Sequence, residues 1–236
     1  MVPEFAQFDR RHYPMVTARE GYEAWAPTYE ETVGVGGGLL DVALLERITS
    51  VDWAALRRVA DLGCGSGRTA AWLRTHGDVP IDGVDAAPAM LEQARARGFH
   101  ELLVVADVRH TGLQSAAYDL VTCVLVDEHL PELAPLYAEA RRLLQPTGTF
   151  VIVGIHPFFQ MAAGMPTHFE TPGVGPVAIE THLHLPSEHV AAAVAAGFGA
   201  RELHEALVDD SVLAHKPNWA EYRDIPFSYA WIWSVS

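Results

Sequence analysis

The sequence is poor in cysteine and in long apolar runs. Its 236 residues include two cysteines, Cys64 and Cys123, which do not make a disulfide framework. No run approaches the roughly 20 apolar residues that span a bilayer. The first residues also lack the basic stretch and apolar core of a secretion signal. We therefore expect a cytoplasmic protein with no membrane partner.

Positive charge is also scarce. Lys and Arg total 16 against 30 Asp and Glu, which gives a formal net charge of −14. Because an acidic surface repels phosphate backbones, this balance disfavours nucleic acid as a partner. Hydrophobic residues make up 50% and charged residues 19% of the chain, a composition typical of globular proteins. The length suits one domain over residues 1–236.

The middle of the chain alternates short apolar runs with helical patterns, which predicts βα units around a parallel sheet. Helices are expected near residues 68–75, 88–97, 133–144 and 188–196, with a turn at 145–148. Seven strands are expected, at residues 58–62, 81–84, 102–106, 118–124, 149–155, 200–208 and 227–235. The late pair of strands indicates a mixed sheet with an antiparallel edge. In the last one, Phe227, Tyr229, Trp231 and Trp233 alternate with smaller residues and should share one face.

A glycine-rich stretch, Asp61-Leu62-Gly63-Cys64-Gly65-Ser66-Gly67, follows the first of these strands and opens a helix. Glycines there permit a tight turn and close approach of a ligand to the backbone. The nicotinamide fingerprint would need glycine at Arg68, and the P-loop pattern lacks its Gly-Lys pair. Asp85 and Asp107 end the next two strands, at the edge where open α/β sheets bind ligands.

These motifs resemble class I S-adenosylmethionine (SAM)-dependent methyltransferases, in the small-molecule branch that includes the ubiquinone and menaquinone methylases. The resemblance covers about residues 58–155. It extends through Gly83-Val84-Asp85, Met90-Leu91, Ala106-Asp107-Val108, Tyr118-Asp119-Leu120-Val121 and Leu143-Leu144-Gln145-Pro146-Thr147-Gly148. Upstream, residues 22–29 resemble the family's N-terminal lid, with Glu30 where Asp is common.

The resemblance implies a Rossmann-like, doubly wound α/β fold with a mostly parallel seven-stranded sheet whose last strand is antiparallel. Residues 1–50 would form a helical lid, and the irregular stretch 156–186 would form an acceptor-side cap. SAM would be the cofactor and S-adenosylhomocysteine the product. The residues implied to contact the cofactor are Tyr22, Tyr29, Asp61, Gly63, Cys64, Gly65, Asp85, Ala86, Met90, Asp107, Val108, Cys123 and Val124. Helix capping or packing remains the alternative for the acids and for the tyrosines of the lid.

Methyl transfer from a sulfonium is an in-line displacement, in which the protein positions the reactants and excludes water. A base is useful where the acceptor is a hydroxyl or an acidic carbon. His129, which follows the fourth strand, is the first candidate, and Asp127 or Glu128 could orient its ring. His156, after the fifth strand, is the second. Structural packing or capping is the alternative for both.

The cap should offer an apolar surface to a small, apolar or aromatic acceptor, with Phe158, Met165, His168 and His182 as candidate contacts. The stretch 216–222 borders either the acceptor pocket or a dimer contact. A metal site built from His168, Glu170, His182 and His184 is a weaker alternative, and we expect no metal.

Other functions stay open at this point. A SAM-binding cyclase or regulator would share the fold without transferring a methyl group. A tRNA or protein methylase is disfavoured by the acidic charge and by the lack of an Asn-Pro-Pro-Tyr-like tetrapeptide after the fourth strand. A homodimer is possible, and the sequence does not identify the acceptor atom.

Overall fold

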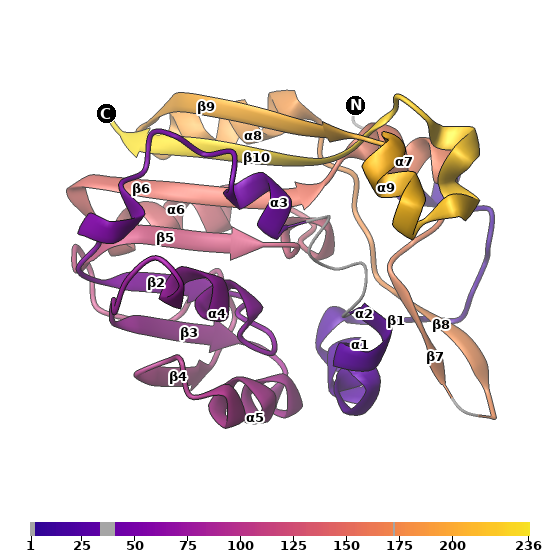
Figure 1. The fold of residues 1–236 in the computed structure, drawn as a ribbon, viewed down its shortest axis with the longest axis horizontal. Helices are drawn as coiled ribbons and strands as arrows, with labels where there is room; N and C mark the ends of the chain where they lie inside the picture. The colour runs from indigo at the N-terminus through magenta and orange to yellow at the C-terminus, as the bar shows by residue number, and fades with distance from the viewer. Residues whose placement is uncertain (1–2, 34–40, 172) are drawn as a thin grey trace.

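The computed structural model describes residues 3–33, 41–171 and 173–236. A seven-stranded sheet in the order β4-β3-β2-β5-β6-β10-β9 runs through the molecule (Figure 1). Its strands are β2 (Val59–Leu62), β3 (Ile81–Asp85), β4 (Leu102–Val105), β5 (Tyr118–Val124), β6 (Leu144–Ile155), β9 (Phe198–Leu207) and β10 (Pro226–Val235). The first five are parallel, whereas β10 pairs antiparallel with both β6 and β9. The expected doubly wound, mostly parallel sheet with an antiparallel last strand is confirmed.

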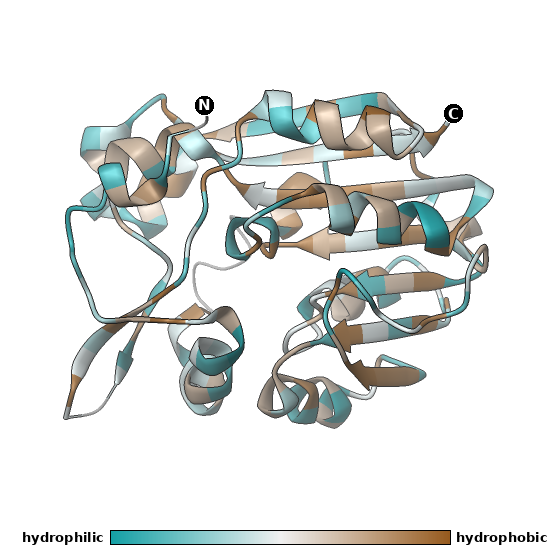
Figure 2. Cartoon of the chain, turned by 180° about the vertical axis from the view of Figure 1, so that it is seen from behind, coloured by the Kyte–Doolittle hydropathy of each residue, from teal (hydrophilic) through white to brown (hydrophobic). Residues whose placement is uncertain are grey.

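Helices cover both faces of this sheet. On one face, α6 (Ala134–Leu143) and α8 (Pro186–Ala195) lie side by side and bury residues against β5, β6 and β10 (Figure 2). On the other, α3 (Val42–Leu45) and α4 (Arg68–Arg74) pack in a second apolar cluster. Helix α5 (Pro88–Arg97) begins with the expected proline and ends at Gly98, whose φ is 73°.

Two local predictions about strands need correction. Strand β6 begins at Leu144, before the expected turn at 145–148, because Leu144 already pairs with Tyr118. The register then shifts, and Thr149 pairs with Leu120. In β10, Tyr229, Trp231 and Trp233 share one apolar cluster, but Phe227 packs in the cluster on the other face, next to a register shift between Pro226 and Ser228.

The N-terminal segment lies beyond the carboxyl ends of the parallel strands (Figure 1). It contains η1 (Phe5–Gln7), β1 (Met15–Val16), α1 (Ala18–Trp25), η2 (Ala26–Thr28) and α2 (Tyr29–Val33). Thr17 and Glu20 form a reciprocal capping box that begins α1. Residues 34–40 of the expected lid lie outside the described residues.

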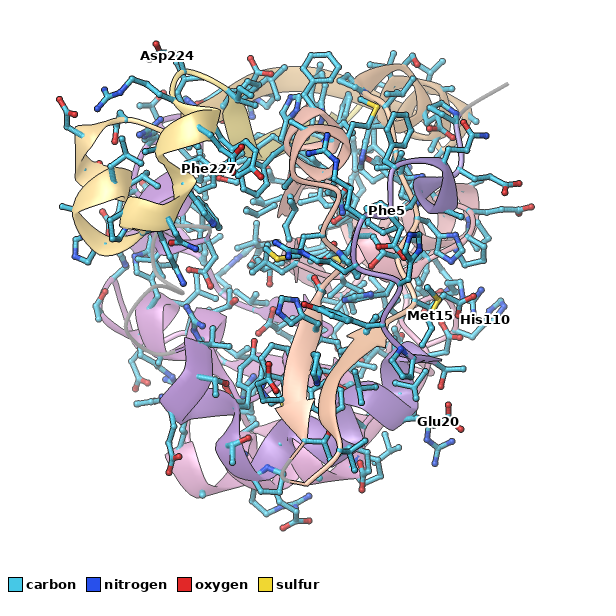
Figure 3. All side chains as sticks on the ribbon, turned by 90° about the vertical axis from the view of Figure 1, so that its right-hand side faces the viewer. Phe5, Met15, Glu20, His110, Asp224 and Phe227 are labelled. Atoms are coloured by element: carbon cyan, nitrogen blue, oxygen red, sulfur yellow. The ribbon has the colours of Figure 1, made fainter. Side chains whose placement is uncertain are left out.

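The stretch 156–186 is more regular than the sequence pattern indicates. It holds α7 (Pro157–Ala163) and a hairpin of β7 (His168–Thr171) and β8 (Gly175–Ile179). Strand β8 also pairs in parallel with β1, so the hairpin completes a small sheet with the N-terminal segment (Figure 3). Short strands with Pro and Gly at their ends carry little periodic signal, which explains why they look irregular in the sequence.

The C-terminal part adds α9 (Asp210–His215) and η6 (Pro217–Tyr222), which pack beside α7 and the start of β10. Short 3-10 turns, η4 (Trp53–Ala55) and η5 (Asp127–His129), precede β2 and follow β5. In the part of the chain that the structure describes, no helix is long and apolar enough to cross a membrane.

Candidate functional site

Two cavities open at the carboxyl ends of the parallel strands. We call the first, of about 420 Å³, the glycine-loop cavity because the loop after β2 lines it. We call the second, of about 380 Å³, the aromatic cavity because Tyr, Trp and Phe side chains line it. Tyr22, Tyr29 and Leu125 line both cavities, so the two spaces meet at these three side chains.

The glycine loop has a backbone that side chains other than glycine disfavour. Gly63, Gly65 and Gly67 have φ values of 70°, 51° and 86°. A Cβ atom at Gly63 would collide with Cγ2 of Val126, so the loop also packs too closely for a side chain. The backbone N–H groups of Gly63 and Cys64 both donate to the carbonyl of Val84, which fixes the loop to β3.

Asp85 holds the loop from the end of β3. Its Oδ2 accepts a hydrogen bond of 2.9 Å from the Gly65 N–H, and its Oδ1 accepts one of 2.8 Å from the Ala87 N–H. Burial raises the pKa of this carboxyl above its usual range. Each oxygen keeps acceptor capacity toward the cavity, which suits the two hydroxyls of a ribose.

Asp61 and Cys123, both implied cofactor contacts, lie beneath the cavity rather than on its wall. Asp61 Oδ1 accepts a 2.8 Å hydrogen bond from Thr122, whereas Oδ2 is buried without a hydrogen-bond partner among the described residues. Cys123 is fully buried in β5. Burial also raises the pKa of the Cys64 and Cys123 thiols, which gives neither the thiolate character of a redox switch.

Asp107 lines the glycine-loop cavity, but its carboxylate already has a partner. The Arg109 guanidinium, which also lines the cavity, donates to both of its oxygens at distances of 2.6–3.1 Å. This pair holds the pKa of Asp107 below its usual range. An adenine amino group would therefore meet a carboxylate that Arg109 orients, a contact that the sequence did not reveal.

The remaining implied cofactor residues lie on the wall of the glycine-loop cavity. They are Tyr22, Tyr29, Gly63, Cys64, Gly65, Ala86, Met90, Val108 and Val124. The lining also includes Ser66 of the glycine loop, and residues that sequence reasoning missed, among them Thr17, Asp41, Arg68, Arg109 and Glu180. Asp41 and Arg68 form an ion pair of 3.0 Å between the end of the N-terminal segment and α4. Asp41 and Arg68 are far apart in the sequence, so no sequence motif predicts that they pair.

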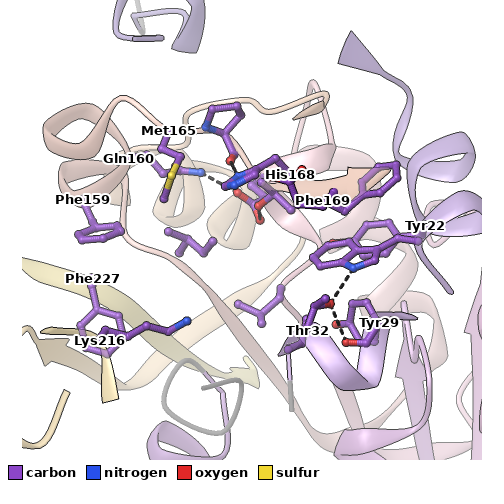
Figure 4. Close-up of a pocket in the computed structure, with 18 of the residues that line it drawn as sticks. Tyr22, Tyr29, Thr32, Phe159, Gln160, Met165, His168, Phe169, Lys216 and Phe227 are labelled. Carbon is purple, nitrogen blue, oxygen red and sulfur yellow. Dashed lines mark hydrogen bonds between the residues drawn. The ribbon is translucent and has the colours of Figure 1, made fainter. Parts of the chain in front are cut away.

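The aromatic cavity lies between the N-terminal helices, the hairpin and η6 (Figure 4). Of the four expected acceptor contacts, Met165 and His168 line it, and Phe158 and His182 do not. The Phe158 side chain is 51% exposed, and its neighbour Phe159 lines the cavity instead. This one-residue difference follows from helix α7, whose start at Pro157 turns Phe159 rather than Phe158 inward.

Leu125 sits at the junction with a strained backbone. Its φ of 58° is unusual for a residue with a branched side chain, and its N–H donates 2.7 Å to the carbonyl of Val153. Residues held in such conformations cluster at functional sites because the surrounding structure has to impose them. The strain therefore marks the turn after β5 as a position where the chain sets the geometry between the two cavities.

His129 lines the glycine-loop cavity with both ring nitrogens engaged. Nδ1 lies 2.8 Å from the carbonyl oxygen of Glu180, so it carries the proton and donates. Nε2 lies 3.0 Å from the Tyr22 hydroxyl and accepts from it. Burial lowers the pKa of His129, which favours this neutral tautomer. The ring thus orients the Tyr22 side chain at the junction.

Glu128 is a buried carboxyl group on the wall of the aromatic cavity. It is 3% exposed, and its two oxygens accept hydrogen bonds of 2.8 Å from Gln160 Nε2 and 2.9 Å from Thr167 Oγ1. Burial raises its pKa to about 7. A proton acceptor works best when its pKa lies near the working pH. Sequence reasoning gave Glu128 only the task of orienting His129.

His156 lies outside both cavities. Its Nδ1 accepts from the Phe158 N–H at 3.2 Å and caps α7, and its Nε2 lies 3.0 Å from Glu205 Oε1. Both ring nitrogens therefore serve the fold, and we do not carry His156 into a mechanism. The metal alternative also lacks support, because the described residues contain no group of three or more His, Cys, Asp or Glu that could hold a metal ion.

The fold family implies SAM, and the glycine-loop cavity fits this molecule. The loop offers a surface without side chains, Asp85 offers two carboxylate oxygens at the strand end, and Asp61 Oδ2 leaves an unsatisfied acceptor beneath the loop. These features suit the methionyl chain, the ribose and a nearby ammonium group.

Comparisons with known proteins agree with this fit. The methyltransferase domain family matches residues 60–152. Human methyltransferase-like protein 27 is 33% identical over 118 residues, covering 47% of this chain and 47% of that protein. Trans-aconitate 2-methyltransferase of Escherichia coli is 31% identical over 109 residues, covering 46% of this chain and 43% of that protein. The chain thus spans about half the length of these curated relatives.

Solved structures show the same fold. A SAM-dependent methyltransferase from Mesorhizobium loti superposes with a TM-score of 0.67 and 23% identity, covering 85% of this chain and 100% of that chain. The family match, the sheet order and the glycine loop at the end of β2 agree with one another. Residues 60–152 match the methyltransferase domain family, and the fold around them is that of a solved SAM-dependent methyltransferase.

Proposed function

We propose that this protein transfers the methyl group of SAM to a small, apolar or aromatic metabolite bound in the aromatic cavity. The observation that carries the proposal is the meeting of two cavities at Tyr22, Tyr29 and Leu125. One cavity has the features of a SAM site, and the other has the apolar walls of an acceptor site. An in-line displacement needs its two reactants on opposite sides of such a junction.

When bound, SAM supplies a methyl group activated by a positively charged sulfur. The chain's own task is to position the acceptor and to keep water out. Tyr22 is held by His129 and packs against Trp25 and Tyr29, with ring centroids 5.9 and 6.1 Å apart. Trp25 in turn donates a 2.8 Å hydrogen bond to Thr32. This aromatic group forms the lid side of the junction.

A hydroxyl acceptor must lose its proton, and we propose that Glu128 takes it. Glu128 lines the acceptor side, whereas His129 lines the cofactor side and spends both nitrogens on Glu180 and Tyr22. The Glu128 pKa of about 7 leaves part of the population ionised at neutral pH. His129 then acts as a positioning residue through Tyr22.

Titration calorimetry with S-adenosylhomocysteine is the first test. We expect binding by the wild type, and we expect mass spectrometry to detect S-adenosylhomocysteine formed from SAM only when an acceptor is present. Formation of a rearranged product without consumption of SAM would favour the cyclase alternative. The matched family and the relatives named above are methyltransferases, which favours methyl transfer.

The choice of base has its own test. Glu128→Gln should lower kcat and remove an apparent pKa near 7 from the pH profile of kcat. His129→Gln should change KM or kcat while leaving that pKa in place. If the profile instead keeps its shape in Glu128→Gln and flattens in His129→Gln, the roles are reversed.

A cytoplasmic location and a homodimer remain predictions.

A further inference from the structure

Lys216 is the single lysine of the chain, and it lines the aromatic cavity. It lies between α9 and η6, where its backbone N–H donates to the carbonyl of Val212 at 2.8 Å. In Figure 4 its side chain extends from one wall toward the interior, on the side opposite Tyr22 and Tyr29. A half-buried cation in a mostly apolar cavity needs a reason.

The described residues give the Lys216 ammonium no anionic partner. None of the ion pairs in the described part of the chain includes it, although Asp and Glu outnumber Lys and Arg by 30 to 16. The Trp219 ring centroid lies 6.0 Å from Nζ of Lys216. An ammonium left without a partner in such an acidic protein is available to a ligand.

The other charged groups on the cavity wall are Glu128 and Glu170, and His168 is a further titratable group. Glu128 is already held by Gln160 and Thr167, and Glu170 is exposed to solvent. Neither carboxyl group can attract an anion. Lys216 is the single lysine or arginine among the residues that line the cavity, so an anionic ligand would bind there. The wall between Lys216 and Glu128 is apolar, with Ile155, Phe159 and Phe227.

We propose that the aromatic cavity takes an acid: a flat, apolar or aromatic molecule whose carboxylate binds the Lys216 ammonium and whose hydroxyl faces Glu128. The role of the hydroxyl as methyl acceptor rests on the proposed function. The binding of the carboxylate by Lys216 is inferred from the cavity alone. A carboxylate–ammonium pair in a partly dry pocket is a charge-assisted hydrogen bond, stronger than a neutral one. The pair selects acids over the matching amides or esters.

The test uses three hydroxylated aromatic acids, each beside its primary amide. They are 4-hydroxybenzoate, 4-hydroxyphenylacetate and 3,4-dihydroxycinnamate, which have zero, one and two carbons between the ring and the carboxylate. Binding to the full chain is followed by intrinsic tryptophan fluorescence, to which Trp25 and Trp219 on the cavity wall contribute. Each titration is run with and without S-adenosylhomocysteine. We expect at least one acid to bind about tenfold or more tightly than its amide.

Three variants assign this preference. Lys216→Met should bind acid and amide alike, and Lys216→Arg should keep most of the preference because it keeps the charge. Arg223→Met is the matched control, because it removes a cation from the same segment outside the cavity, where Arg223 pairs with Asp210. Arg223→Met should leave the preference unchanged.

The single lysine allows a second readout. An amine-reactive acetylating reagent can modify only Lys216 and the N-terminal amine, and mass spectrometry separates the two sites. The binding acid should slow acetylation at Lys216 but not at the N-terminus, and its amide should slow neither.

The proposal is overturned if no acid in the panel binds, if acid and amide bind equally to the wild type, or if Lys216→Met keeps the preference. Failure of the proposed function looks different. In that case S-adenosylhomocysteine would not bind, and the preference for the acid and the protection of Lys216 would persist.

Discussion

The two cavities are built in different ways. The glycine-loop cavity is shaped by backbone: a loop whose glycines have positive φ, and a carboxylate at the end of the next strand. The aromatic cavity is shaped by side chains from α1, β7, α7, η6 and β10, elements far apart in the sequence. The first cavity is therefore a local property of the chain, and the second exists only once the fold is complete.

This comparison is tested most directly at Asp85. Asp85→Ala should weaken S-adenosylhomocysteine binding by about 100-fold or more, since two hydrogen bonds to a charged group at about 1.5 kcal/mol each are lost. Asp85→Asn keeps part of the geometry and should lose less. Calorimetry measures both. The binding of aromatic acids in the other cavity should stay within about threefold of wild type.

If Asp85→Ala binds S-adenosylhomocysteine as tightly as the wild type does, Asp85 does not hold the ribose. The proposal that each cavity binds its own ligand would then lose its support. Melting curves of the variant are needed beside the titration, because Asp85 also accepts from the Gly65 and Ala87 amides. A folded variant without affinity supports the assignment.

The aromatic cavity can be tested through pH. Burial raises the pKa of Glu128 from an unfolded value near 4.5 to about 7. Its protonated form is therefore favoured by folding, so its contribution to stability is complete below pH 4.5 and is lost as pH rises through about 7. The difference corresponds to at most about 3 kcal/mol.

Urea unfolding at pH 5 and pH 8 measures this term against Glu128→Gln, which cannot titrate. The wild type should lose up to about 3 kcal/mol more between the two pH values than the variant does. Asp127, whose pKa burial raises to about 6, titrates in both proteins. Because the Glu128 charge contributes to that rise, the difference between the two pH curves includes the coupling of these two carboxyl groups. Parallel pH curves would show that Glu128 is ionised in the folded protein at all these pH values.

The junction between the cavities can be tested at Leu125. Leu125→Gly should relieve about 1 kcal/mol of backbone strain, since glycine adopts a positive φ freely. It also removes a side chain that both cavities share. We expect a small change in melting temperature and a clear fall in kcat.

Ala116→Gly is the matched control for Leu125, because Ala116 also has a positive φ, of 51°, and lines neither cavity. It should relieve similar strain while kcat and both affinities stay as in wild type. A Leu125→Gly enzyme with full activity would mean that this side chain does not set the geometry of transfer.

The same contrast explains what could be predicted from the sequence. The βα alternation predicted the seven strands of the main sheet closely, because strongly apolar strands and capped helices carry their own signal. The glycine loop, Asp85 and Met90 line the glycine-loop cavity as expected, because their motifs follow directly after strongly apolar strands. The burial of Asp61 and Cys123 beneath the loop could not be predicted, because it depends on how the loop turns over them.

The acceptor side was predicted less well. Phe158 and Phe159 are adjacent in an aromatic pair, and only the start of α7 decides which of them faces the cavity. Glu128 was given a supporting task because nothing local shows that Gln160 and Thr167 hold it. The partners of such residues come from distant segments, so the chemistry cannot be read from a motif.

The smallest expected effect concerns His156, which sequence reasoning placed in catalysis and which the structure places at the start of α7. His156→Ala removes the cap, which should cost about 1 kcal/mol of stability. His156→Asn offers another capping side chain and should recover most of it. Because the ring lies outside both cavities, affinity for S-adenosylhomocysteine and for the acceptor should stay at wild-type levels in both variants. The assignment is wrong if kcat falls in His156→Ala, stays low in His156→Asn and does not recover at higher pH. His156 would then take part in the reaction, and the acceptor site would extend beyond the aromatic cavity.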